Sequence, residues 1–165
     1  GIETIEPLLQ TIDSIHQNET SKPLHRSLLI ACLLFPIIEK ALHFDFLSKD
    51  HTPHLGEITQ LTHATIRDIV TTSFTHFPRR ISAIVSYILS TQYRFHPFSG
   101  RVHYPPRVFR HKDFPLALYF LKIRALNDSE LMPVYAGWRD HYRRFIQQHD
   151  PKKHHSPPTK KVMHE

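Results

Sequence analysis

The sequence predicts an all-α protein, a single irregular domain of about six helices over residues 1–149, followed by a disordered basic tail over residues 150–165. Apolar residues recur at helical spacing through most of the chain, and no segment shows the strict alternation of a half-buried strand. Four glycines against 13 prolines suit helices with hard stops better than a barrel with many tight turns. A chain of 165 residues is also long enough to bury a real core.

The first two helices are predicted from their apolar patterns. Residues 3–17 form an amphipathic pattern in which Leu8 and Ile12 fall on one face. From residue 24 to about residue 47 the chain is apolar almost all round, which is typical of a central buried helix. Pro36 lies inside this stretch and is expected to kink or split the helix.

Two further helices follow a loop over "SKDHTPHLG". Apolar residues at helical spacing predict a third helix over residues 58–74. Pro78 suits the first turn of a fourth helix, whose apolar face carries Ile81, Ile84 and Ile88.

The passage from residue 93 to residue 114 is predicted to be extended or irregular, with a short helical turn near "PRVFR". Asp113 is expected to cap the next helix, which contains "PLALYFLKIRAL". Asn127, Asp128 or Ser129 can cap the last helix, through "ELMPVYAGWRDHYRRFIQQ".

The formal net charge of +6 is unevenly distributed along the chain. Residues 1–68 are net acidic, whereas residues 69–112 carry seven basic residues and no acidic one, and residues 113–165 are again net basic. Such asymmetry suggests an anionic partner more strongly than the total charge does.

The candidate binding residues are basic side chains within residues 69–112, an acid-free block, and on the two helices predicted after it. Arginine binds phosphate bidentately, and Arg79 and Arg80 also stand at a predicted helix start, where the helix dipole favours an anion. The complete set, with one aromatic residue expected to stack on an unpaired base, is Arg79, Arg80, Arg101, Tyr104, Arg107, Arg110, Lys112, Lys122, Arg124, Arg139, Arg143 and Arg144. Phe95, Phe98 and Phe109 are assigned to the core instead.

Other kinds of site find little support in the sequence. The 15 histidines include His51 and His54 in a loop and two in the tail, but four zinc ligands at a defined spacing are missing, so surface histidine is the preferred interpretation. Cys32 lies in an apolar run and reads as a core thiol. Asp128 and Glu130 fit helix capping better than catalysis. With no glycine-rich phosphate loop either, we expect no complete active site here.

We expect a cytoplasmic protein that makes no contact with a membrane. A single cysteine cannot form an intrachain disulfide, which permits a reducing compartment. No signal peptide is recognised, and the longest apolar run, residues 28–38, is too short to span a bilayer.

The order of several segments resembles the C-terminal part of bacterial poly(A) polymerase, in the nucleotidyltransferase group that also contains the CCA-adding enzymes. The segments are "LLIACLLFPIIEKAL", "FPRRISAIVSYILSTQYRF", "FRHKDFPLALYFLKIRAL" and "ELMPVYAGWRDHYRRF". In the third, His111, Phe114, Ala117, Leu121, Arg124 and Ala125 fall where that family has similar residues. The tail departs from the family pattern, because it carries lysines where the family often has arginines.

The resemblance implies an all-helical region that grips RNA mainly through its phosphates. It also implies that ATP and Mg²⁺ are bound by a catalytic head, whose Gly-Gly and paired-aspartate motifs are missing from this sequence, so that this chain needs no cofactor and is inactive alone. Two alternatives stay open: the corresponding body of a CCA-adding enzyme, and a helical scaffold whose basic surface binds an acidic protein partner.

Overall fold

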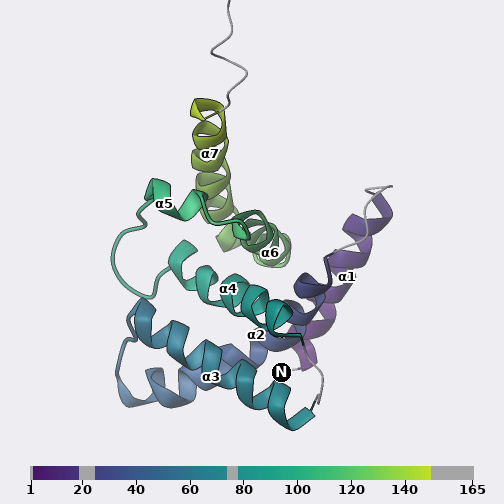
Figure 1. Cartoon of the computed structure of the whole chain (residues 1–165), viewed down its shortest axis with the longest axis vertical. Coiled ribbons are helices and arrows are strands. Elements are labelled where there is room, and N and C mark those ends of the chain that lie inside the picture. Colours follow the sequence, from purple (N-terminus) through teal and green to yellow (C-terminus); the bar gives the residue numbers. More distant parts are fainter. Residues whose placement is uncertain (1, 19–24, 74–77, 150–165) are drawn as a thin grey trace, which may run out of the picture.

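A computed structural model of the chain describes residues 2–18, 25–73 and 78–149 (Figure 1). This part of the chain contains helices and no strand, which confirms the all-α class. The predicted tail over residues 150–165 lies outside the described residues. The helices are α1 (Ile2–Asn18), α2 (Arg26–Asp45), α3 (Leu55–Ser73), α4 (Arg79–Phe95), α5 (Pro106–Phe109), α6 (Phe114–Asn127) and α7 (Met132–Gln148), with 3-10 turns at Leu47–Lys49 and Ser129–Leu131.

The larger of two hydrophobic cores forms around α2, which contacts α1, α3, α4 and α6 (Figure 1). Its inward face, which includes Cys32, Ile38 and Leu42, is almost completely buried. Burial raises the pKa of the Cys32 thiol to about 12, so the thiol stays protonated at neutral pH. The prediction that Cys32 is a core thiol is therefore confirmed.

The outward face of α2 differs from the prediction. Leu29, Leu33 and Ile37 recur every four residues and are exposed, so the helix is not buried all round. A split at Pro36 is also wrong, because α2 continues unbroken through this residue while packing against its neighbours on the buried side. By length and composition alone, Arg26–Lys49 is the one segment among the described residues that could cross a membrane. A core helix of a soluble protein and a signal sequence pass the same test, so this segment is only weak evidence for a membrane span.

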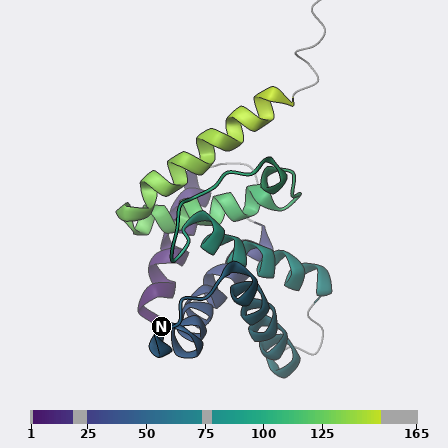
Figure 2. The same cartoon turned by 90° about the vertical axis from the view of Figure 1, so that its left-hand side faces the viewer.

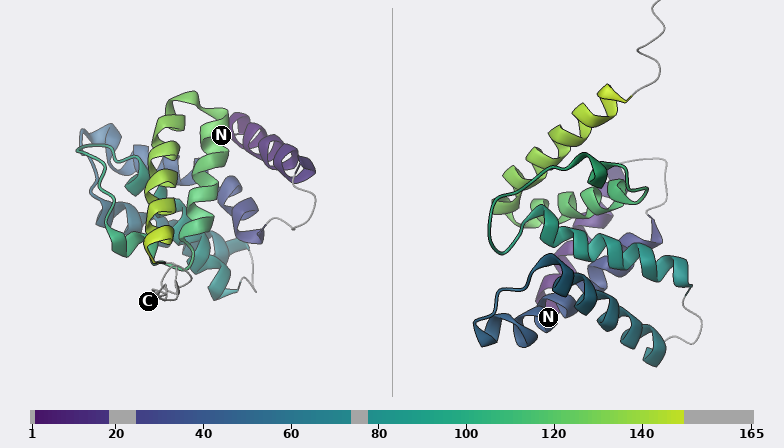
Figure 3. Two further views of the ribbon diagram at one scale, coloured as in Figure 1. Left: turned by 90° about the horizontal axis from the view of Figure 1, so that it is seen from above. Right: turned by 60° about the vertical axis from the view of Figure 1, so that its left-hand side comes forward.

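The smaller core is built from α5, α6, α7 and the end of α4, and α6 joins it to the larger one. Phe120 and Ile123 of α6 belong to the larger core, whereas Phe114 and Leu121 belong to the smaller. Because α6 is covered on both sides, it is apolar all round, as its sequence "PLALYFLKIRAL" indicates. Helix α7 turns back beside α6 at the far end of the molecule (Figures 2 and 3).

Trp138 on α7 closes the smaller core. Its side chain is fully buried against Phe95, Tyr104 and Phe114, with the Phe95 and Trp138 ring centroids 4.9 Å apart. The indole Nε1–H donates a hydrogen bond to the Phe95 backbone carbonyl at 3.1 Å. The last residue of α4 is thereby tied to α7.

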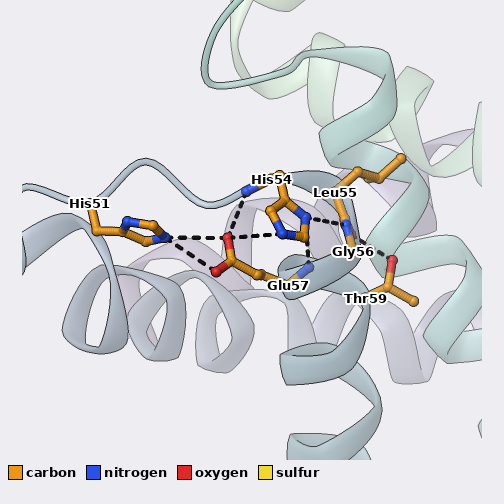
Figure 4. A network of polar contacts seen from close by, with 6 residues as sticks. All are labelled: His51, His54, Leu55, Gly56, Glu57 and Thr59. Carbon is orange, nitrogen blue, oxygen red and sulfur yellow. Dashed lines mark hydrogen bonds and ion pairs between the residues drawn. The ribbon is translucent and has the colours of Figure 1, made fainter.

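The start of α3 is capped by an imidazole and a carboxylate (Figure 4). His54 Nδ1 accepts from the backbone N–H groups of Gly56 and Glu57, and Glu57 Oε2 accepts in return from the His54 N–H at 2.9 Å. This is a reciprocal capping box with histidine in the place of serine. A Cβ at position 56 would lie 3.0 Å from the His54 ring, a tight contact that the ring could relieve only by shifting.

The Glu57 carboxylate should stabilise the protein only when it is ionised. Its hydrogen bond from the His54 backbone, helped by the His51 and His54 side chains, lowers its pKa from the usual 4.5. A lowered folded-state pKa contributes stability that is present above the unfolded value and lost as the pH falls through the folded one. We expect Glu57→Gln, which keeps the acceptor, to lower the melting temperature at neutral pH and to match the unaltered chain in acid. A melting-temperature difference that does not shrink on acidification would contradict this account.

Replacing Trp138 by Phe should destabilise the fold, because the buried donor is lost and the smaller ring leaves a void. We expect the free energy of unfolding to fall by about 2 kcal/mol in urea titrations followed by circular dichroism. Leu126 is half exposed, so Leu126→Ala is the control and should cost no more than about 0.5 kcal/mol. An equal loss of unfolding free energy in the two variants would show that the Trp138 contacts do not stabilise the fold more than an exposed side chain does.

Candidate nucleic-acid interface

The irregular passage between α4 and α6 is held against α7 by its aromatic side chains. The Tyr104 ring stacks on the His141 ring of α7, with centroids 3.7 Å apart and planes 2° from parallel. A Cβ at position 137 would lie 2.8 Å from the Tyr104 hydroxyl, so Gly137 is what allows this ring to lie across α7. The passage is therefore fixed in place although it has little regular structure of its own.

Phe109, on α5, anchors the second half of the passage. Its ring is buried and contacts Phe114 edge-on, and it also packs on Tyr142 and Phe145 of α7. Arg107, two residues before Phe109, and Arg110, directly after it, are exposed. The predicted short turn near "PRVFR" is thus the element that presents these two arginines.

This arrangement places α5, with its exposed arginines, against the part of α7 that carries Arg143 and Arg144. We define the α5 surface as six exposed basic residues of the passage and of the end of α7. They are Arg101, Arg107, Arg110, Lys112, Arg143 and Arg144. None of them forms an ion pair with a carboxylate of the described residues. Arg139 is different, because its Nε donates to Asp140 at 3.1 Å, which partly neutralises it.

Arg94, which lies at the edge of the α5 surface, is absent from the predicted set. It stands two turns after Tyr87 on α4, and the Tyr87 ring stacks on His111 at 3.7 Å, so the passage lies over this face of α4. Burial lowers the pKa of the half-buried Arg94, and the nearby charge of Arg107 lowers it further. The sequence signal was present, since Arg94 belongs to the acid-free block, but its nearness to Arg107 depends on the fold.

Arg79 and Arg80 stand apart from the α5 surface. They begin α4, whereas the passage leaves from its other end, and a helix of 17 residues is about 25 Å long. Both are exposed at the start of the helix, as predicted. The predicted set is therefore spread over the two ends of α4. Lys122, on α6, lies 5.7 Å from the centroid of its neighbour Tyr119 and is half-buried.

Arg124 does not extend the exposed basic field, unlike the prediction. Its Nη1 donates to the Gln92 side chain at 3.1 Å, and its guanidinium lies 4.4 Å from the centroid of the Phe35 ring. Burial lowers its pKa, an effect opposed by the nearby Tyr93 and Glu39. These contacts give Arg124 a place inside the protein between α2, α4 and α6.

The aromatic residues of the passage are arranged differently from the expectation. Phe95 and Phe109 are buried, as predicted, but Phe98 is wrong as a core residue, because it is 42% exposed and packs on Tyr93 at 5.3 Å. Tyr104, predicted to stack on a base, has one face covered by His141 and also contacts Trp138. Phe98 is the more accessible ring, and its exposure could not be seen in the sequence pattern.

Neither a metal centre nor an acidic catalytic pair emerges from the part of the chain that is described. No group of three histidine, cysteine or carboxylate side chains among these residues is placed to hold a metal ion. His51 and His54 instead contact Glu57, at 3.2 and 3.6 Å. Asp128 accepts a hydrogen bond from the Glu130 N–H and caps the turn before α7, which confirms the capping interpretation.

A comparison with protein families relates most of the chain to a known family. The model of the family described as "Polymerase A arginine-rich C-terminus" matches residues 58–162. This span contains α3 from its second turn onward, α4 to α7 and every predicted binding residue. No curated protein and no solved structure matches the chain.

Arg124→Ala should affect stability, because it removes the hydrogen bond to Gln92 and the packing on Phe35. We expect the free energy of unfolding to fall by about 2 to 4 kcal/mol, measured by urea titration. Arg110→Ala removes the same charge from an exposed position and should change this energy by less than about 0.5 kcal/mol. A small loss for Arg124→Ala would mean that its guanidinium does not support the interior.

Proposed function

Because the chain belongs to the family of polymerase A arginine-rich C-termini, we propose that it is the RNA-gripping region of a poly(A) polymerase, an enzyme that adds AMP to RNA 3′ ends. The observation that carries the proposal is the α5 surface, with its six exposed basic side chains and no ion pair to a described carboxylate. Unpaired cations on a rigid support attract a polyanion, because no internal partner competes with it.

The binding mode follows from the chemistry of arginine. A guanidinium binds a phosphate through two parallel hydrogen bonds, and such contacts position a strand without reading its sequence. Phe98, half exposed at the edge of the passage, offers one ring on which an unpaired base could stack. We therefore propose nonspecific binding of single-stranded RNA, with most of the affinity coming from phosphates.

In the proposed enzyme the chemistry takes place elsewhere. ATP and Mg²⁺ would be held by a nucleotidyltransferase head, and this chain would contribute by keeping the RNA in place. On this proposal the chain by itself binds RNA and transfers no AMP.

Two alternatives predict different ligands for the same surface. A CCA-adding enzyme would use it to hold tRNA, so a preference for tRNA over unstructured RNA would favour that activity. A scaffold for an acidic protein would leave single-stranded RNA unbound. Raised absorbance at 260 nm in the purified protein, which indicates bound nucleic acid, is a rapid first test.

Replacing Arg101, Arg107 and Arg110 together with Ala should weaken RNA binding about equally for oligoadenylate and oligouridylate. The dependence of log affinity on log salt should flatten by roughly 0.7 per lost phosphate contact, measured by fluorescence anisotropy. The control combines Arg26→Ala, Lys40→Ala and Lys49→Ala, which removes three exposed positive charges from α2 and the turn after it. Unchanged affinity and slope in the first variant, or an equal loss in the control, would disprove the proposed role of the α5 surface.

A further inference from the structure

A second basic site lies in a groove between α3 and α4. The groove has a volume of about 370 Å³, within the range of small-ligand sites. It lies between the second half of α3 and the start of α4, two helices that pack along each other. Its lining residues are His63, Ile66, Arg67, Val70, Thr71, Arg79, Ser82, Ala83 and Ser86.

The ionisable side chains that line this groove are all basic. Arg67 and Arg79 approach it from the two helices, His63 adds a third nitrogen-bearing side chain, and no carboxylate lines it. Neither arginine forms an ion pair with another described residue. The nearest acid in sequence, Asp68, follows Arg67 directly, and successive residues of a helix point about 100° apart.

Hydroxyl groups complete the lining. Ser86 is 2% exposed and lies on the groove wall. Ser82 lies one turn earlier on the same helix. A serine hydroxyl that lines a groove can donate a hydrogen bond to an oxygen of a bound anion.

The first turn of α4 supplies a further attraction for an anion. Pro78 is the N-cap of this helix and makes no side-chain capping bond. The first backbone N–H groups of a helix have no intrahelical acceptor, and the helix dipole places partial positive charge there. Arg79 stands at this end of the helix and also lines the groove.

We infer that the α3–α4 groove is a phosphate-binding site, in which Arg67 and Arg79 hold the anion and Ser86 donates to one of its oxygens. A phosphate fits the arrangement, because its several oxygens can accept hydrogen bonds from two guanidinium groups and a hydroxyl at once. The RNA backbone is the source of that phosphate, a part of the inference that rests on the proposed function. The groove would then be a second holding point for the strand, at the opposite end of α4 from the α5 surface.

The site itself can be tested with inorganic phosphate, without RNA. In a titration of the full chain followed by NMR, the side-chain Nε–H signals of Arg67 and Arg79 should shift and saturate. In the single variant Arg67→Gln the Arg79 signal should no longer shift with phosphate, and in Arg79→Gln the Arg67 signal should no longer shift. The circular dichroism spectrum of both variants should stay unchanged. If phosphate leaves both arginine signals in place, or shifts all arginine signals alike, the site does not exist.

The source of the phosphate is tested by RNA affinity. The double variant Arg67→Gln/Arg79→Gln should bind an oligoadenylate about tenfold more weakly at physiological salt. The dependence of log affinity on log salt should flatten by roughly 1.4, for two lost phosphate contacts. The control, Arg26→Gln/Lys40→Gln, removes the same charge from exposed positions of α2 and should change neither value as much. If phosphate binds but the double variant and the control hold RNA equally well, the RNA source is wrong. If the unaltered chain binds no RNA, the proposed function fails, and the phosphate titration still decides the site.

Discussion

The arrangement of the whole domain depends on one buried amide, that of Gln92. Its side chain is 1% exposed, at the crossing of α4 and α6. The amide nitrogen donates to the backbone carbonyls of Ile88 and Ala117, and the amide oxygen accepts from Arg124. A buried polar group is tolerated only when its hydrogen bonds are satisfied, and these partners come from two different helices. The crossing is thus fixed in one register, which a purely apolar contact would define less strictly.

This register determines where the basic side chains lie. With α4 and α6 locked, Phe95 and Phe114 meet edge-on and create the place that Trp138 fills. The passage between the two helices lies against α7 and presents its arginines outward, while its Tyr104 and Phe109 rings pack on α7. The positive surface is therefore a product of the aromatic packing beneath it. At the other end of α4, the same helix contributes Arg79 and Ser86 to the groove with α3.

The sequence predicted the helices well and the positions of individual side chains less well. Helical spacing identified all the long helices, and "PRVFR" was correctly seen as a short turn, because these features depend on local pattern. The course of α2 through Pro36 and the exposure of Phe98 depend on neighbours distant in the chain. Arg124 shows the same limit, because nothing in "LKIRAL" reveals that its guanidinium meets Gln92 of another helix. For the same reason the nearness of Arg94 to Arg107, and of Arg67 to Arg79, could not be predicted.

Trp138 is the single tryptophan of the chain, and its position makes it a local spectroscopic reporter. Its indole is enclosed by Phe95, Tyr104 and Phe109, all within the smaller core. Tryptophan fluorescence, excited where tyrosine does not absorb, therefore observes only the half of the molecule that carries the α5 surface, while circular dichroism observes all helices together. If the two halves open separately on heating, the two signals will have different midpoints, and their divergence will measure how strongly α6 couples them. The natural chain thus already contains the probe needed to follow one half of its fold independently of the other.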